Sequence, residues 1–363
     1  MKAGIVGLPN VGKSTLFNCL SNTKAQSANF PFCTIEPNHS IINVPDMRLN
    51  TLEELVSPEK VIPATVEIVD IAGLVKGASK GEGLGNKFLA NIRETDAIIH
   101  VLRCFDNDNI THVDGSVNPV RDKEIIDIEL QLKDLETINN RLEKVSRSAK
   151  SGDKDSIAEK NVLEKAKNLI ESSSNIRTID LDNDDINKFL KPLQLITAKP
   201  VLYVCNVDEE SAKSGNQYSK KIDEYGLNKE INVIKISASI ESQISELSDE
   251  DRDEYIRSLG LAEPGLNTLI NEGYNTLDLI TYFTSGPKET RAWTITKDTL
   301  APESAGKIHT DFEKGFIRAE TINYDELINF SNYNEAKDAG KIRLEGKEYE
   351  VKDGDIMNFR FNN

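Results

Sequence analysis

The residues with the clearest chemical potential form the run Gly7-Leu8-Pro9-Asn10-Val11-Gly12-Lys13-Ser14, which fits the phosphate-binding loop pattern G-x-x-x-x-G-K-[ST]. In such a loop, glycines let several backbone N–H groups point at one anion, and the following helix adds its positive end. The pattern predicts that Lys13 reaches the β- and γ-phosphates of a nucleotide and that Ser14 offers a hydroxyl to Mg²⁺. The predicted nucleotide-binding residues of this loop are Asn10, Val11, Gly12, Lys13, Ser14 and Thr15.

Two downstream segments carry candidates for handling the metal and the γ-phosphate. Asp70 and Gly73 belong to a D-x-x-G sequence at the end of an expected strand. Alone, this sequence is typical of an ordinary turn. After a phosphate-binding loop it predicts that Asp70 holds the Mg²⁺ shell and that the Gly73 N–H binds the γ-phosphate. Thr34 lies in the loop before the second strand, where switch GTPases close a threonine on Mg²⁺. The predicted metal ligands are therefore Ser14, Thr34 and Asp70.

A third segment bears on the choice of base. Asn206-Val207-Asp208-Glu209 follows an apolar strand, at the place where GTPases carry N-K-x-D and the aspartate accepts two hydrogen bonds from guanine. Here Val207 replaces the lysine and Glu209 replaces the aspartate, with a carboxylate about one methylene too far forward. A site that bonds guanine poorly loses its discrimination. We therefore predict that ATP binds at least as well as GTP. Ser237 and Ala238 match the loop that contacts the base edge.

The group that would orient the attacking water is less clear. Leu74 stands where many GTPases carry a glutamine, and leucine cannot hydrogen-bond to water. His112, in the loop after a central strand, is a candidate because a neutral imidazole can orient water, although a capping or solvated histidine is the alternative. Asn10 is a candidate ligand for K⁺, which would add positive charge in the transition state. The predicted catalytic residues are His112, Gly73 and Lys13.

The order of the expected elements indicates how these residues are positioned. Apolar runs predict strands at 3–6, 41–44, 65–70, 97–102, 200–205 and 232–236, with helices after Lys13 and over 84–94. This alternation is typical of an α/β fold with a parallel sheet. Glycines crowd the stretch from 73 to 85, which favours a loop that switches conformation over a merely flexible one.

A different pattern interrupts the α/β region. From about Asp122, apolar residues recur at spacings of three and four, a polar break covers 148–156, and a second helical run follows. Two such helices predict an antiparallel hairpin that packs mainly on itself, followed by a short helix around 184–194. Because strand signals resume at 200, the hairpin is an insertion into the α/β domain.

After about Asp278 short β-rich runs predict a small α+β module, with strands at 291–296, 316–320, 347–351 and 356–361. The expected domains are residues 1–118 with 197–277, an insertion at 119–196, and a C-terminal domain at 278–363.

Composition excludes several classes of protein. The chain has 363 residues, 38% hydrophobic and 29% charged, which is typical of a globular protein of two or three domains. A net charge of −16 argues against a surface coated in basic residues, so no direct DNA role is expected. We expect no membrane-spanning segment and no secretory signal. Four scattered cysteines indicate reduced thiols in a cytoplasmic protein.

Together, G-L-P-N-V-G-K-S, D-I-A-G-L-V, the stretch G-A-S-K-G-E-G-L-G-N-K-F-L and N-V-D-E resemble the YchF/OLA1 subfamily of Obg-like P-loop NTPases over nearly the whole chain. The resemblance implies an OBG-type G domain interrupted by a helical hairpin, and a C-terminal TGS domain of β-grasp fold. It also implies a preference for ATP over GTP, association with the ribosome or its large subunit, and a hydrophobic residue at the position of Leu74.

Three alternatives to a slow ATP-dependent switch stay open from the sequence. An ordinary Obg-like GTPase would still use Glu209 to bind guanine. A nucleotide-sensing scaffold would bind ATP with negligible hydrolysis, as the presence of Leu74 allows. A metabolic P-loop kinase would need an acceptor pocket, and the pairing of Asn206–Glu209 with Ser237–Ser239 argues against that class.

Overall fold

The computed structural model describes residues 2–22, 38–71, 84–112, 115–229 and 231–362. These residues group into two compact units. The first contains residues 2–22, 38–40 and 67–269, apart from the stretches left undescribed, and the second contains 41–66 and 270–362. The chain therefore enters the second unit early, returns to the first, and enters the second again near its end.

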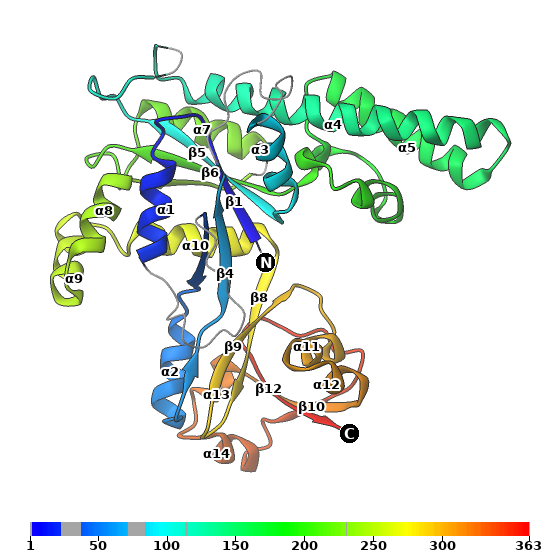
Figure 1. Ribbon diagram of the computed structural model, residues 1–363. Coiled ribbons are helices and arrows are strands. Elements are labelled where there is room, and N and C mark those ends of the chain that lie inside the picture. The colour runs from blue at the N-terminus through cyan, green and yellow to red at the C-terminus, as the bar shows by residue number, and fades with distance from the viewer. Residues whose placement is uncertain (1, 23–37, 72–83, 113–114, 230, 363) are drawn as a thin grey trace. The chain divides into compact units, whose positions relative to one another are not determined.

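One six-stranded sheet carries the candidate site, with the strand order β2-β4-β1-β5-β6-β7 (Figure 1). The pairings of β1 with β4 and β5, of β5 with β6 and of β6 with β7 are parallel. Strands β5 and β6 are buried along their whole length, as near-continuous apolar runs predict for central parallel strands. The strands are β1 (Lys2–Val6), β2 (His39–Asn43), β4 (Thr65–Asp70), β5 (Ala97–Cys104), β6 (Val201–Val207) and β7 (Val233–Ile236).

Helices follow the strands and pack against them. α1 packs against β1 and α8, and α7 packs against β6 and β7. Because consecutive parallel strands need such crossovers, the carboxyl ends of the strands share one edge, and the loops that follow them meet there. The helices are α1 (Lys13–Asn22), α3 (Leu84–Arg93), α7 (Gln217–Lys229), α8 (Ala238–Glu246), α9 (Asp249–Ser258) and α10 (Gly265–Thr276).

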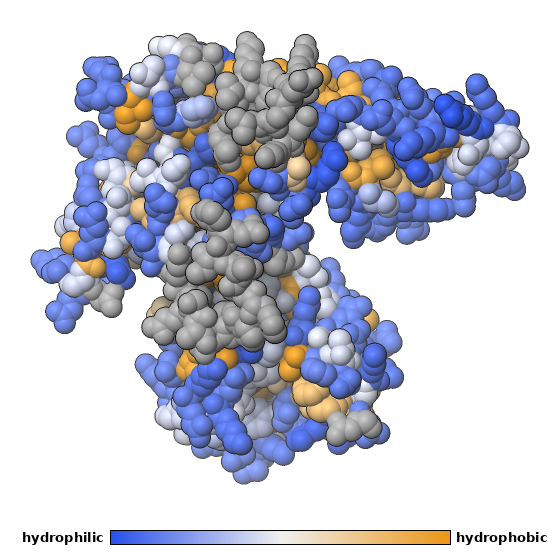
Figure 2. All heavy atoms as spheres, viewed as in Figure 1, coloured by the Kyte–Doolittle hydropathy of each residue, from blue (hydrophilic) through white to orange (hydrophobic). Residues whose placement is uncertain are grey.

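The predicted helical hairpin lies between β5 and β6. α4 (Pro119–Lys150) and α5 (Lys154–Glu171) run side by side in Figure 1, joined by a turn shorter than the predicted break. Asn118 caps α4 by accepting a hydrogen bond from the Arg121 N–H, and a proline occupies the first helical position. The two helices bury a shared apolar core, while the outer surface of the hairpin is largely hydrophilic in Figure 2.

The helix expected around 184–194 is present as a continuous helical segment over 183–193, but its geometry is irregular. It consists of a short α-helical turn α6 (Asn183–Asp185), a wide π-type turn η3 (Ile186–Leu190) and a 3₁₀ turn η4 (Lys191–Leu193). Pro192 explains the irregularity, because its ring excludes a normal helical hydrogen bond and crowds the preceding turn. Two further 3₁₀ turns, η2 (Ile176–Thr178) and η5 (Ile196–Ala198), complete the return to β6.

A second six-stranded sheet has the order β11-β10-β12-β8-β9-β3. Its core includes Tyr282, Ile295, Met357 and Phe359 together with residues of α11. The strands are β3 (Val61–Ile62), β8 (Leu279–Ser285), β9 (Thr290–Thr296), β10 (Phe316–Asn323), β11 (Arg343–Glu345) and β12 (Asp355–Phe361). The helices are α2 (Met47–Val56), α11 (Ala301–Ile308), α12 (Thr310–Lys314), α13 (Tyr324–Leu327) and α14 (Tyr333–Asp338).

The strand predicted at 347–351 is wrong. Tyr349 N–H bonds back to the Gly346 carbonyl in a turn, and only Glu350 forms an isolated bridge, with Leu300. The apolar residues at alternate positions, which resembled a strand pattern, are explained by other contacts. Val351 is buried in the core, and the Tyr349 hydroxyl donates to Asp355. The edge strand of this sheet, β11, lies a few residues earlier.

Two sequence expectations can be compared with the described residues alone. Within them no helix is both long and apolar enough to cross a membrane. Cys19, Cys104 and Cys205 are buried free thiols, and Cys33 lies outside the described residues.

Candidate nucleotide-binding site

The phosphate-binding loop follows β1 and leads directly into α1, as predicted. The first helical hydrogen bond runs from the Leu16 N–H to the Gly12 carbonyl, 3.0 Å away. Gly12 has φ +97°, and a Cβ on it would collide with the Asn206 side-chain nitrogen. Only glycine therefore satisfies both the backbone conformation and the close approach of Asn206.

Lys13 and Asp70 lie at the base of this loop. Lys13 is 8% exposed, and its Nζ lies 3.4 Å from the Leu8 carbonyl oxygen. The β1–β4 register places Asp70 beside Ile5, just before the loop begins. Burial lowers the pKa of Lys13 and raises the pKa of Asp70, and the attraction between the two opposite charges opposes both shifts. The pair thus interacts electrostatically across the strand ends.

One carboxylate oxygen of Asp70 provides a test of the predicted metal site. Asp70 Oδ1 is buried and finds no hydrogen-bond partner among the described residues. A buried carboxylate oxygen needs a partner, and hard cations such as Mg²⁺ take oxygen ligands. Ser14, which is exposed in the first turn of α1, supplies a second oxygen. The donor set fits Mg²⁺. Thr34 and Gly73, like Leu74, lie outside the described residues.

Asn206 joins the phosphate loop to the predicted base-edge loop. This residue is 3% exposed, its Nδ2 donates to the Val11 carbonyl at 2.9 Å, and its Oδ1 accepts from the Ala238 N–H at 3.0 Å. Val207 is the last residue of β6, and its apolar side chain is buried. The structure therefore brings together four of the predicted binding residues, Val11, Gly12, Asn206 and Ala238.

Glu209 lies on the surface beside α8. Its Oε1 accepts hydrogen bonds from Ser239 Oγ at 2.6 Å and Gln243 Nε2 at 2.9 Å. Ser237 precedes α8 and is buried, and its hydroxyl has no hydrogen-bond partner among the described residues. The two side chains of the base-edge region thus have opposite surroundings, one solvated and bonded, the other buried and unpaired.

His112 is held at the start of the helical hairpin. Its Nε2 lies 2.8 Å from Asp122 Oδ2, and Asp122, in the first turn of α4, is 1% exposed. The preceding residue, Thr111, accepts a hydrogen bond from Asn10 Nδ2 through its carbonyl, at 3.1 Å. The phosphate loop, the loop after β5 and the base of the hairpin are therefore linked by consecutive hydrogen bonds.

Two family models match parts of the chain. One, described as "YchF-GTPase_C: Protein of unknown function (DUF933)", matches residues 279–362, and one described as "50S ribosome-binding GTPase" matches residues 2–134. Full-length relatives include the "Ribosome-binding ATPase YchF" of Escherichia coli O157:H7, 54% identical over 99% of both chains. The protein of that name from Bacillus subtilis is 53% identical over 100% of this chain and 99% of its own.

The chain belongs to the YchF family.

A solved structure agrees with this membership. The Schizosaccharomyces pombe YchF GTPase matches with a TM-score of 0.89 and 39% identity, covering 99% of this chain and 97% of its own. The predicted fold class is confirmed, with a P-loop α/β region, the α4–α5 hairpin inserted into it and a C-terminal α+β region. The YchF resemblance that we drew from the motifs is confirmed with it.

Several side chains that organise this YchF site were missed by sequence reasoning. Arg103 is buried at the end of β5 and donates to the carbonyls of Phe105, Asn107 and Ile110, which shapes the loop that carries His112. Asp122 and Gln243 were also missed. Arg103 bonds to nearby backbone carbonyls in a loop that no sequence pattern describes, whereas Asp122 and Gln243 act through His112 and Glu209, 10 and 34 residues away.

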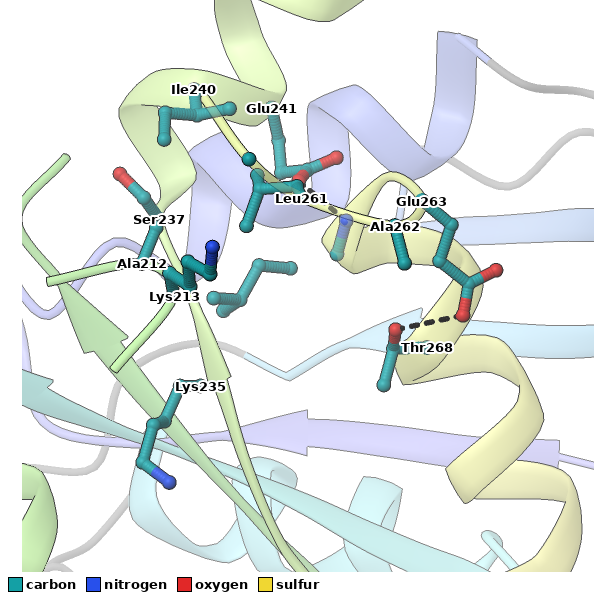
Figure 3. Close-up of a pocket in the computed structure, with 13 residues that line it drawn as sticks. Ala212, Lys213, Lys235, Ser237, Ile240, Glu241, Leu261, Ala262, Glu263 and Thr268 are labelled. Atoms are coloured by element: carbon teal, nitrogen blue, oxygen red, sulfur yellow. Dashed lines mark hydrogen bonds between the residues drawn. The ribbon is translucent and has the colours of Figure 1, made fainter. Parts of the chain in front are cut away.

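A separate pocket of about 280 Å³ includes Ser237 but none of the residues from Gly7 to Ser14 (Figure 3). Lys213 and Lys235 line it, as does Glu241, which is buried and accepts a hydrogen bond from the Gly265 N–H at 2.8 Å. The Glu241 carboxylate thereby connects α8 to the N-terminus of α10. This arrangement stabilises the helices behind the base-edge loop.

Proposed function

We propose that the chain is a P-loop ATPase whose nucleotide state controls its binding to the ribosome. Relatives that are more than half identical over their whole length are named ribosome-binding ATPases, which supports the activity and the partner. The family model that matches residues 2–134 is described as a 50S ribosome-binding GTPase, which favours the large ribosomal subunit as the partner. This partner implies a cytoplasmic protein.

The observation that carries the proposal is the interaction of buried Lys13 with half-buried Asp70 at the base of the phosphate-binding loop. A lysine held in low dielectric near a carboxylate, one of whose oxygens has no hydrogen-bond partner in the part of the chain that the structure describes, is poised for a phosphate and a cation together. Bound Mg²⁺ would neutralise charge developing on the phosphates, with Ser14, Asp70 and Thr34 as its proposed ligands. Lys13 would bind the β- and γ-phosphates, and the Gly73 N–H the γ-phosphate.

For base recognition, we assign Asn206, Val207, Glu209, Ser237 and Ala238. Asn206 fixes the phosphate loop and the base-edge loop relative to each other through its two hydrogen bonds. Glu209, longer than the usual aspartate and already bonded to α8, supports a preference for ATP over GTP. Val207 presents no ammonium group to either base.

His112 is the proposed water-orienting residue. Its backbone neighbour Thr111 is bonded to the phosphate loop, which supports a position near the γ-phosphate. A carboxylate partner such as Asp122 fixes the orientation of an imidazole and the nitrogen that carries its proton. The Asn10 Oδ1 is the atom that would take K⁺, since its Nδ2 already donates to Thr111.

We also propose a division of labour among the expected domains. Residues 1–118 with 197–277 form the OBG-type G domain, and 119–196 form the inserted hairpin. Residues 278–363 form a TGS-like β-grasp domain. The hairpin and the TGS-like domain supply surfaces for the ribosome. The hydrogen bonds from Asn10 to Thr111 and between the next residue, His112, and Asp122 support communication between the nucleotide and the hairpin.

The first test is titration calorimetry of the full chain with non-hydrolysable analogues of ATP and GTP, each with Mg²⁺. We expect the ATP analogue to bind at least as tightly as the GTP analogue. Clear preference for the GTP analogue would identify an ordinary Obg-like GTPase. Binding of neither would refute the proposal.

The second test is single-turnover hydrolysis of ATP with and without ribosomes. We expect slow release of phosphate alone and a different rate when ribosomes are present. Negligible turnover in both cases would favour a nucleotide-sensing scaffold, and transfer of the phosphoryl group to a small acceptor would favour a kinase.

A further inference from the structure

We propose that Gln243 and Ser239 of α8 set the base preference by holding the Glu209 carboxylate in a fixed position and by donating hydrogen bonds to one of its two oxygens. The inference rests on the proposed function, because it concerns how that site distinguishes ATP from GTP. It assigns positioning roles to two residues outside the motif that contains Glu209.

The geometry concentrates two donors on one oxygen. Glu209 Oε1 accepts from Ser239 Oγ at 2.6 Å and from Gln243 Nε2 at 2.9 Å. The two donors are also close to each other, with Gln243 Nε2 lying 3.4 Å from Ser239 Oγ. They stand one helical turn apart on α8, so they face the same side. Hydrogen bonds to an ionised acceptor are stronger than those between neutral groups.

The chemistry of the partners fixes which way the Gln243 amide points. An ionised Glu209 can only accept, so the amide nitrogen must face it. The amide oxygen then faces Tyr255, whose hydroxyl donates to it. Tyr255 lies on α9 and is only partly exposed, so the neighbouring helix orients the amide. Tyr255, Gln243 and Glu209 form one directional chain of hydrogen bonds.

This arrangement affects the two bases differently. Guanine presents two donors, N1–H and the N2 amino group, and a carboxylate reads them with both oxygens. At Glu209 one of those oxygens already serves two protein donors, so binding guanine requires those bonds to be broken or shared. Adenine has neither donor and loses nothing. The arrangement therefore weakens GTP binding selectively.

The test measures dissociation constants of the full-length protein for non-hydrolysable ATP and GTP analogues with Mg²⁺, by calorimetry. The main variant is Gln243→Glu, which keeps the size of the side chain and an acceptor for Tyr255 but repels Glu209. Ser239→Ala and Tyr255→Phe each remove one further hydroxyl. We expect all three to shift the affinity ratio toward GTP, by about three- to tenfold for Gln243→Glu and less for Tyr255→Phe.

Two controls separate positioning from general damage. A misfolded variant loses affinity for both analogues, whereas the proposal requires the ratio to move. In a Glu209→Ala background, Gln243→Glu should leave the ratio unchanged, because the residue that it positions is gone.

An unchanged ratio in Gln243→Glu and Ser239→Ala, together with a shift toward GTP in Glu209→Asp, would overturn the inference and assign the preference to side-chain length alone. A wild-type protein that binds neither analogue would overturn the proposed function and this inference with it. A wild type that prefers ATP, with an unchanged ratio in every α8 variant, would overturn the inference alone.

Discussion

Asn206 shows how one buried amide can connect two loops that are far apart in sequence. Its Nδ2 donates to the Val11 carbonyl of the phosphate loop, and its Oδ1 accepts from the Ala238 N–H of the base-edge loop. The strands that precede these loops are separated by β5 and β6 in the sheet order, so the amide of Asn206 and the packing of α1 against α8 connect the two loops across the sheet. The same amide also explains the glycine at position 12.

We predict that Asn206→Ala weakens nucleotide binding and the fold together. The change leaves the Val11 carbonyl and the Ala238 N–H without their partner, at a cost of about 1–3 kcal/mol for buried groups. Urea unfolding and calorimetry with the ATP analogue measure the two effects. Ser245→Ala, an exchange on nearby α8, serves as the control. Equal stability of the Asn206→Ala variant and the wild type would contradict the assignment.

His100 gives a second prediction at this scale, on pH. The residue is buried in β5 with its ring centroid 5.6 Å from that of Tyr203, as expected for a packed histidine. Burial lowers its pKa to about 4, below the value of about 6.5 in an unfolded chain. Between these values the unfolded state binds more protons, so stability falls as pH falls from about 6.5 to about 4, by roughly 3 kcal/mol.

Replacing His100 with glutamine should flatten that part of the pH profile. Urea unfolding at pH 7.5, 6.0 and 5.0 (chosen about the ordinary histidine pKa) compares the variant with the wild type. A profile that stays equally steep in the variant would show that His100 is not the group responsible.

At the scale of elements, the hairpin is anchored by a carboxylate in the middle of α4. Asp134 is fully buried and accepts from the backbone N–H groups of Ile196 and Thr197 and from the Thr197 hydroxyl, at 2.7 to 2.9 Å. These bonds join α4 to the turn η5 just before β6. The long helix and the returning chain are thereby fixed to each other at the base of the insertion.

Asp134→Ala should destabilise the junction by about 2–4 kcal/mol, because three donors lose their acceptor in a buried site. Hydrogen exchange should speed up in 195–198 before it does in the sheet. Glu136→Ala on the same helix is the matched control, since its side chain is largely exposed and its surface ion pair contributes little. Similar losses in both variants would argue against a specific anchor.

The elements themselves were largely predictable. Periodicity located both long helices and the central strands, because those patterns follow directly from which face is buried. It failed at 347–351, where a turn at Gly346 replaces the expected strand, and it did not indicate that the helix around 184–194 would be irregular before Pro192. In the site, the phosphate loop and Asn206 follow from local motifs. Arg103, Asp122 and Gln243 do not, because their hydrogen bonds depend on how an irregular loop folds or on contacts between separate segments.

At the scale of the whole molecule, the segment 41–66 is the least expected feature. In sequence, α2 and β3 come between β2 and β4 of the first sheet, yet the segment belongs to the second unit. There β3 pairs with β9 in parallel, and α2 packs against the same strand. Arg48 of α2 bonds to Asp46 and to Asp353, and its guanidinium lies 5.2 Å from the centroid of the Phe283 ring.

We predict that Arg48→Met destabilises the second unit by about 1–3 kcal/mol, since two carboxylates lose a charged partner. Limited proteolysis should cut 44–64 faster than in the wild type. Arg318→Met, an exposed arginine of β10 with no ion pair among the described residues, is the control. If both variants resist protease equally well, Arg48 does not secure the segment.

The early position of α2 also has a consequence for biosynthesis. Arg48 and its partner Asp353 are separated by 305 residues, and the chain between them must be translated before they can meet. At the usual speed of synthesis, α2 and β3 wait on the order of 15 to 60 s for the strands that complete their sheet. Until β9 has been synthesised, α2 lacks the strand against which it packs. The second unit of this protein therefore cannot fold cotranslationally from its N-terminal end, and it closes only when the last strands leave the ribosome.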